Sequence, residues 1–81
     1  MIHDLKTHPE YFAALVSGSK NFEVRKNDRT YLIGDELLLR EYSPDGNVYT
    51  GRILHRRVDY ILNGGQFGIE PDYCVMSLSK I

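Results

Sequence analysis

The chain has 81 residues, of which ten are Lys or Arg and eleven are Asp or Glu, so its formal net charge is −1. That length indicates one domain over residues 1–81, and a hydrophobic content of 42% with interspersed charge excludes a disordered chain. We expect a cytoplasmic domain without membrane contact, because Met1 leads into a charged segment and no apolar run reaches the ~20 residues that span a bilayer.

The first predicted elements are a short strand and a helix. Residues 2–6 predict the strand, with Ile2 and Leu5 as its apolar contributors. Thr7 and Glu10 have the spacing of a capping box, in which each side chain bonds to the other residue's amide. Apolar residues at 11, 12, 15 and 16 form one stripe, and Gly18 is typical of a helix end. The helix is therefore expected at about 8–17.

Strand signals follow the helix. Glu23 and Arg25 alternate with Phe22 and Val24, which places the two pairs on opposite faces of a strand. Turn-forming residues then enclose a short apolar piece, and residues 36–42 form a leucine-rich strand. Its three consecutive leucines, at 37–39, predict burial on both faces.

The second half of the chain predicts two further strands. Residues 48–62 form one long strand or two strands joined by a bulge, which we place between Leu54 and Arg57 because the apolar residues on either side differ in parity. Residues 73–79 form a closing strand, whose inward side chains are expected to be Cys74, Met76 and Leu78.

The element order is therefore β-α-β-β-β-β. Several short strands with Gly and Pro turns and a single helix favour an α+β fold that is mainly β. We expect a small, partly closed antiparallel β-barrel with the one N-terminal helix packed beside it.

The small net charge hides an uneven distribution. Residues 20–57 hold eight basic and six acidic side chains, a net +2, whereas the two flanking segments together carry −3. The basic side chains form two runs, which are Lys20, Arg25, Lys26 and Arg29, and then Arg52, His55, Arg56 and Arg57. Tyrosines beside such runs are typical of surfaces that stack unpaired bases. A solvated strand face with cross-strand ion pairs is the alternative reading.

The most specific pattern is G-x-K-x-x-E-x-R, from Gly18 to Arg25. Lys20 stands at the helix-to-strand junction, and Glu23 and Arg25 share a strand face, so the three charged groups are expected to meet at the mouth between helix and barrel. The alternative is a helix C-cap followed by a surface ion network.

This segment resembles the signature of the ASCH domain, a branch of the PUA-like superfamily. The resemblance continues through residues 25–29, 34–37, 39–42, 49–52, 58–62, 67–68 and 73–78, so it covers nearly the whole chain. The chain is similar to the small stand-alone ASCH-related domains of unknown function found in bacteria and their phages. The resemblance implies a PUA-like β-barrel with a charged cleft that binds RNA or a nucleotide-like ligand.

The expected RNA- or ligand-binding residues are Lys20, Glu23, Arg25, Lys26, Arg29, Arg40, Tyr42, Arg52 and Arg56. We expect Tyr31 or Tyr42 to stack a base and Arg52 to point toward Glu41 or a phosphate. No cofactor is expected, and the three scattered histidines and single cysteine predict no metal site. The default oligomeric state is a monomer.

Two alternatives remain open at this point. The resemblance also suggests an ASCH-type hydrolase or ribonuclease, with Lys20 and Glu23 as catalytic residues. Some members of the superfamily deacetylate N4-acetylcytidine through a Lys, a Thr and a Glu, but Glu23 stands here where the Thr is expected, which argues against that reaction. The other alternative is a phage or mobile-element protein-interaction domain.

Overall fold

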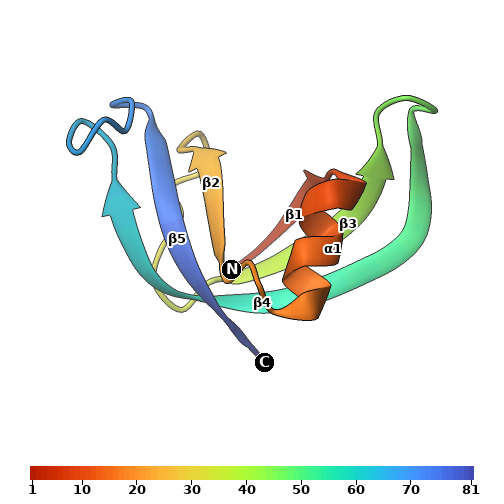
Figure 1. Cartoon of the computed structure of the whole chain (residues 1–81). Coiled ribbons are helices and arrows are strands. Elements are labelled where there is room, and N and C mark those ends of the chain that lie inside the picture. The colour runs from red at the N-terminus through yellow and green to blue at the C-terminus, as the bar shows by residue number, and fades with distance from the viewer.

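The computed structural model describes all 81 residues as one curled sheet with one helix (Figure 1). The elements are β1 (Ile2–Thr7), α1 (Pro9–Ser17), β2 (Phe22–Lys26), β3 (Glu36–Ser43), β4 (Val48–Asn63) and β5 (Tyr73–Lys80). The α+β, mainly β class and the element order predicted from the sequence are confirmed. No helix has the length and apolar character needed to cross a bilayer.

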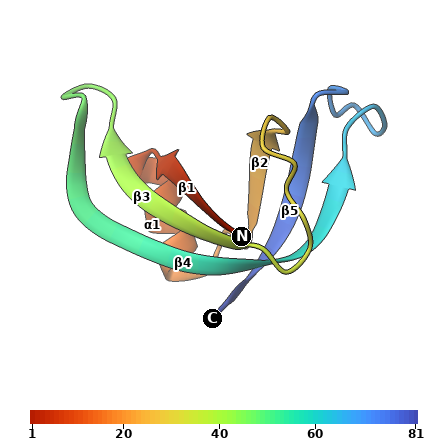
Figure 2. The same ribbon diagram turned by 180° about the vertical axis from the view of Figure 1, so that it is seen from behind.

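The five strands form a single sheet in the order β1-β3-β4-β5-β2. Strand β4 runs along the base of the curl and bends upward at both ends, so the edge strands β1 and β2 face each other across the opening (Figures 1 and 2). The result is a half-barrel. β1 and β3 pair in parallel, unlike every other pair, because the chain crosses to the far edge as β2 before it returns as β3.

The core lies between the concave face of the sheet and α1. Alternate residues of β5 point inward, as predicted: Cys74 and Met76 are fully buried and Leu78 nearly so. Phe12 and Leu15 on one face of α1 are also buried, whereas Tyr11 and Val16 are about half exposed. The helix therefore covers the sheet with a narrow apolar stripe.

The N-terminal end of α1 differs from the prediction. Thr7 is still a strand residue, His8 is the N-cap without a side-chain cap, and Pro9 begins the helix, so the predicted capping box is wrong. β1 buries His3, Leu5 and Thr7, which directs the Thr7 side chain into the sheet interior instead of toward the helix amides. For the same reason Ile2 is exposed.

The C-terminal end of α1 agrees with the prediction. Gly18 is the C-cap with φ +83°, and its N–H donates to the Leu15 carbonyl at 3.2 Å. This left-handed residue reverses the chain toward β2 and so delivers Lys20 to the gap between helix and sheet.

The predicted bulge position in β4 is wrong. The ladder with β3 is unbroken from Ile53 to Arg57, and the irregularities lie on both sides of it, near Gly51 and at Asp59. Leu54 and Val58, four residues apart, point to the same inward face. Ile61 packs against the same core although it is three residues from Val58, so the strand must contain one extra residue between Val58 and Ile61.

The leucine run in β3 also differs from the prediction. Leu37 and Leu39 are fully buried, but Leu38 faces the other side of the sheet and is partly exposed. One covering helix protects only the concave face, so β3 alternates as a strand buried on one face does.

Candidate functional site

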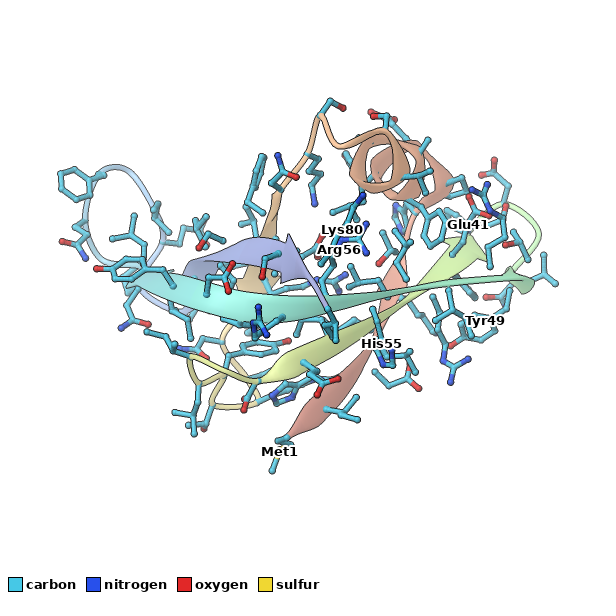
Figure 3. All side chains as sticks on the ribbon, turned by 90° about the horizontal axis from the view of Figure 1, so that it is seen from below. Met1, Glu41, Tyr49, His55, Arg56 and Lys80 are labelled. Atoms are coloured by element: carbon cyan, nitrogen blue, oxygen red, sulfur yellow. The ribbon has the colours of Figure 1, made fainter.

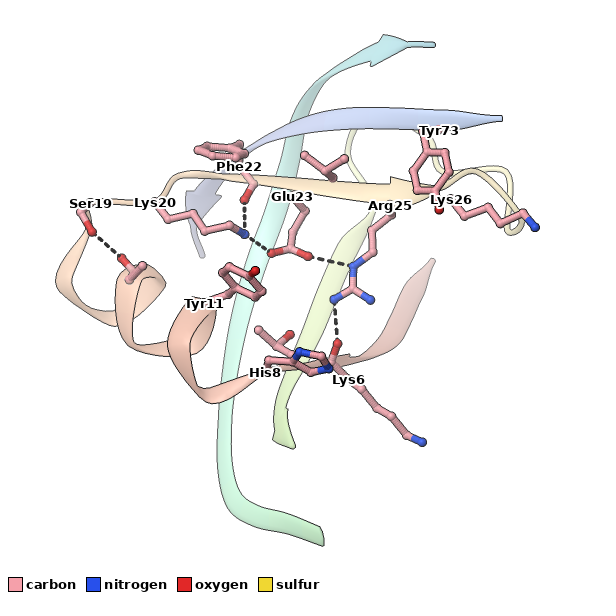
Figure 4. A pocket seen from close by; sticks show the side chains of 13 residues that line it. Lys6, His8, Tyr11, Ser19, Lys20, Phe22, Glu23, Arg25, Lys26 and Tyr73 are labelled. Atoms are coloured by element: carbon pink, nitrogen blue, oxygen red, sulfur yellow. Dashed lines mark hydrogen bonds and ion pairs between the residues drawn. The ribbon is translucent and has the colours of Figure 1, made fainter. Parts of the chain in front are cut away.

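A pocket of about 720 Å³ lies between α1, the end of β1 and strand β2 (Figure 4). Its lining residues are Lys6, Thr7, His8, Tyr11, Ala14, Ser19, Lys20, Phe22, Glu23, Val24, Arg25, Lys26 and Tyr73. Lys20, Glu23 and Arg25 stand at its centre, and we call these three residues the charged triad and this cavity the triad pocket. The convergence predicted from the G-x-K-x-x-E-x-R pattern is therefore present.

The Glu23 carboxylate is held on both sides by cations. Lys20 Nζ lies 2.5 Å from Glu23 Oε1, and Arg25 Nε donates to Glu23 Oε2 at 2.8 Å (Figure 4). The Glu23 side chain is only 4% exposed, compared with 16% for Lys20 and 25% for Arg25. A buried carboxylate needs such partners because desolvation without them is costly, so the triad is a built feature of the interior and not a surface ion network.

The register of β2 explains why Glu23 is buried. Glu23 pairs with Met76 and Arg25 pairs with Cys74, two residues whose side chains point into the core. Cross-strand partners share a face, so β2 turns its charged pair inward. Its apolar residues, Phe22 and Val24, are correspondingly 44% and 51% exposed.

Two arginines bridge the gap between the edge strands, which we call the seam. Arg25 Nη2 donates to the Lys6 carbonyl at 2.8 Å, and Arg29 Nη1 donates to the Asp4 carbonyl at 3.0 Å. These carbonyls belong to β1, whose free edge faces β2. The guanidinium groups thus satisfy backbone acceptors that a closed barrel would pair with another strand.

The charged triad keeps donors free for a ligand. The Lys20 ammonium has three N–H groups, of which the structure uses two, toward Glu23 and the Phe22 carbonyl. Lys20 Nζ also lies 5.9 Å from the Tyr11 ring centroid and 5.1 Å from that of Phe22. The triad pocket therefore combines unused cationic donors with aromatic walls.

A second hollow of about 760 Å³, the outer pocket, adjoins the first. It is lined by Asp4, Leu5, Lys6, Arg25, Arg29, Arg40 and Tyr49. Arg25 and Lys6 line both pockets. Arg40 Nε is 2.8 and 2.9 Å from the two Asp4 carboxylate oxygens.

The first basic run is brought together at these two pockets. Lys20, Arg25 and Lys26 line the triad pocket, and Arg29 joins Arg40 in the outer pocket. Tyr42 lines neither cavity, but its ring lies 4.5 Å from Lys6 Nζ and 5.1 Å from the Tyr49 ring.

The second basic run lies elsewhere. Arg52 is 3.8 Å from the Glu41 carboxylate, as expected, and 4.9 Å from the Phe12 ring centroid, but it lines neither pocket. Arg56 lies beside Lys80 on the helix side of β4, with His55 on the opposite side (Figure 3). The structure therefore separates Arg52 and Arg56 from the charged triad.

Tyr31 cannot stack a base as the sequence suggested. It is only 6% exposed and its ring packs edge-on against His3, with centroids 4.6 Å apart. Burial raises the pKa of its phenol above 10.0. Tyr31 is a core residue of the loop that leads into β3.

Sequence reasoning missed Thr7, Tyr11 and Lys6 as pocket residues. Thr7 Oγ1 is fully buried and has no hydrogen-bond partner, although the residue lines the triad pocket. Its position before a proline and a glutamate indicated a helix cap and concealed this role. The sequence did hold a signal for Tyr11. It directly precedes the buried Phe12, which puts its ring at the edge of the apolar stripe of the helix, where a side chain can line a pocket.

The metal-ligating side chains are dispersed, and the one cysteine is a core residue. No group of three His, Cys, Asp or Glu side chains converges on a common point. Cys74 is fully buried in the core, and that burial raises the pKa of its thiol.

Comparisons with known proteins relate the chain to one family. The family model described as "Domain of unknown function (DUF3850)" matches residues 2–78. The chain is also similar to the "Uncharacterized 12.9 kDa protein in GpA 3'region" of Escherichia phage P2, with 42% identity over 57 residues. The matched region is 70% of this chain and 50% of the phage protein, so the chain corresponds to about half the length of that relative.

Proposed function

The chain belongs to the DUF3850 family of domains of unknown function, and we propose that it is an RNA-binding module that takes an unpaired base into the triad pocket. The proposal extends to the ASCH and PUA-like resemblance of residues 18–25, which implies a charged cleft at this place between helix and barrel. The proposed chemistry is recognition, with the bound nucleotide held by aromatic contact and by the free donors of the charged triad.

The observation that carries the proposal is the concentration of positive charge at the two pockets. Their lining residues include six cations, which are Lys6, Lys20, Arg25, Lys26, Arg29 and Arg40, and two carboxylates, Asp4 and Glu23. The local net charge is therefore +4 on a chain whose total is −1. Such a local field attracts a polyanion even when the whole molecule is slightly acidic.

The walls of the triad pocket suit a nucleobase. Tyr11 supplies an aromatic face on the side of the charged triad, while Phe22 and Tyr73 line the cavity from the other face of β2 (Figure 4), and a cavity of about 720 Å³ falls in the size range of small-molecule sites. Lys20 and Arg25 have only donors to offer, so they favour a base that presents a carbonyl oxygen or a ring nitrogen with a free lone pair. Unpaired bases are the form of RNA that proteins read in this way.

The contacts of Glu23 favour binding over hydrolysis. Both of its carboxylate oxygens already accept from Lys20 or Arg25. An attacking water or hydroxyl would therefore compete with these ion pairs for the carboxylate that must act as general base. The Lys20 ammonium stays protonated in this pairing, so its remaining N–H can donate to a ligand but the group cannot act as a base. We therefore place the hydrolase or ribonuclease alternative second.

The proposal is tested by titrating a labelled, randomised eight-residue RNA and following fluorescence anisotropy at several salt concentrations. Three to five phosphate contacts predict a log–log slope of affinity against salt of about −2 to −4. Lys20→Ala should weaken binding about tenfold, because it removes a charged donor from the pocket. Lys80→Ala removes the same charge outside both pockets and is the matched control.

Three outcomes contradict the proposal. One is the absence of binding at low ionic strength, which together with a stoichiometric protein partner would favour the interaction-domain alternative. Another is equal weakening by Lys20→Ala and Lys80→Ala, which would show attraction without a site. The third is equal affinity for a randomised DNA of the same length, which would exclude an RNA-specific role.

A further inference from the structure

We propose that the outer pocket is a second nucleotide subsite, so that the ligand is a single strand of at least two nucleotides that crosses the seam. This inference rests on the proposed function and makes it more specific: it excludes a free nucleoside or mononucleotide as the full ligand. The triad pocket holds one base, and the outer pocket holds the phosphate and sugar of its neighbour.

The two pockets form one path because they share residues. Arg25 and Lys6 line both cavities, and the Arg25 guanidinium stands in the seam, where Nη2 donates to the Lys6 carbonyl at 2.8 Å. The Lys6 side chain points away from the charged triad (Figure 4). β1 buries Leu5 and Thr7 and exposes Asp4 and Lys6, so the outer pocket continues the surface onto the opposite face of the sheet edge.

The outer pocket has the donors that a phosphodiester needs. Arg29 uses Nη1 for the Asp4 carbonyl and Arg40 uses Nε for the Asp4 carboxylate, while the structure gives no partner to Arg29 Nη2 or to either Nη atom of Arg40. Their side chains are 45% and 36% exposed, so these forks remain accessible. Two guanidinium groups in one pocket match the oxygens of a phosphate better than they match the edge of a base.

The charge balance of the outer pocket also points to a polyanion. Four cations line it against the single carboxylate of Asp4, a local +3. The exposed Asp28 carboxylate lies 3.9 Å from Arg29 Nε at the margin and does not enter the lining. Tyr49, about half exposed, adds an aromatic face beside this cationic group. Phosphate donors beside an aromatic ring form the usual pair of features for one nucleotide of a bound strand.

The test compares a mixture of the four mononucleotides with randomised oligoribonucleotides of two, four and eight residues. Each is titrated into the whole chain and followed by NMR. We expect affinity to rise about tenfold or more from one to two residues, as the second nucleotide reaches Arg29 and Arg40. Arg29→Gln should weaken dinucleotide binding about five- to tenfold and leave mononucleotide binding within about twofold. Arg57→Gln, which changes a similarly exposed, carboxylate-paired arginine outside both pockets, is the control.

The outcomes separate this inference from the proposed function. A mononucleotide that binds the triad pocket as tightly as the dinucleotide, or an Arg29→Gln variant that binds all lengths like the unchanged protein, overturns the second subsite and leaves RNA binding intact. Failure of every length to bind overturns the proposed function itself. Equal losses for Arg29→Gln and Arg57→Gln would assign the effect to overall charge and also overturn the inference.

Discussion

Glu23 is the residue on which the candidate site depends, because its burial organises the two cations beside it. Its oxygens accept from Lys20 at 2.5 Å and from Arg25 at 2.8 Å, and Arg25 in turn reaches the Lys6 carbonyl across the seam. One carboxylate therefore links the helix exit, the edge strand β2 and, through Arg25, the opposite edge strand β1. Such buried ion pairs tolerate the loss of one member poorly, since the remaining charges are left without compensation.

We expect Glu23→Gln to lower the free energy of unfolding by about 3 kcal/mol, because Lys20 and Arg25 then face each other without a counter-charge. Urea unfolding followed by circular dichroism measures the change. Glu70→Gln, at an exposed loop position, is the matched control and should change stability by less than about 0.5 kcal/mol. Equal stabilities of the two variants would show that the charged triad does not stabilise the fold.

Replacing threonine by valine is expected to change the free energy of unfolding in opposite directions at positions 7 and 50. Thr7 Oγ1 is buried without a partner, whereas the Thr50 hydroxyl donates to Glu41 Oε1 at 2.7 Å. Thr7→Val should raise the free energy of unfolding by about 1 kcal/mol, because it removes an unsatisfied polar atom at constant shape. Thr50→Val should lower it by about the same amount. Thermal unfolding of both variants checks the pair, and a destabilised Thr7→Val contradicts the unpaired state of this hydroxyl.

The ionised Asp35 carboxylate is expected to stabilise the fold, so the protein should lose stability in acid. The hydrogen bond to His3 at 2.8 Å is the main reason why the pKa of Asp35 lies below its ordinary value of 3.8, with the Leu32 amide and the terminal amine as further partners. A lowered folded-state pKa stabilises the protein above the unfolded value, and this contribution disappears as pH falls through the folded value.

The stability difference between the unchanged protein and Asp35→Asn should therefore shrink between about pH 5 and pH 2. Urea unfolding at several pH values measures it, and comparison with the variant cancels the titration of the other carboxylates. A difference that stays constant over this interval would contradict the stabilising role of the ionised Asp35.

At the scale of single elements, β4 determines how far the sheet curls. Its two irregularities, near Gly51 and at Asp59, flank the straight ladder with β3 and let both ends of the strand bend upward. Gly51 has φ +94°, a region that side chains with a Cβ adopt only under strain. The bend near Gly51 also brings Thr50 and Arg52 to Glu41.

Gly51→Ala should lower the free energy of unfolding by about 1–2 kcal/mol, because open space surrounds the position and only the backbone conformation opposes a side chain. Chemical denaturation measures the effect. Gly46→Ala is the control: it lies in the turn before β4 without a positive φ, and its new Cβ would contact only the end of the Val48 side chain. A Gly51→Ala variant as stable as the control would indicate that the strand can relax its bend.

The elements differ in how well their sequences predict them. β5 was predictable because Cys74, Met76 and Leu78 are apolar at every second position, and burial follows that alternation. The bulge in β4 was misplaced because Val58, Tyr60 and Leu62 alternate equally well, yet packing selects Ile61 across the register shift. Local patterns specify alternation but cannot specify which side of an irregularity meets the core.

At the scale of the whole molecule, a chain with a charge of −1 separates into a cationic seam and an acidic remainder. The six cations of the two pockets come from β1, the helix exit, β2, the following loop and β3, so only the curl of the sheet brings them together. The sequence predicted the triad because its members are close neighbours in the chain. It named Arg40 among the binding residues, but it could not predict that Lys6 joins them or that Arg52 and Arg56 do not, since these positions depend on which edges the curl brings face to face.

The most direct test of RNA recognition at the triad pocket is an NMR titration of the ¹⁵N-labelled chain with a randomised eight-residue RNA. We predict that shift changes concentrate on residues 6–8, 11 and 19–26, together with the Arg25 side-chain Nε–H, and that they spread to Arg29 and Arg40. Changes confined to Arg52, Arg56 and the outer face of β4, or no changes at low salt, would contradict the account.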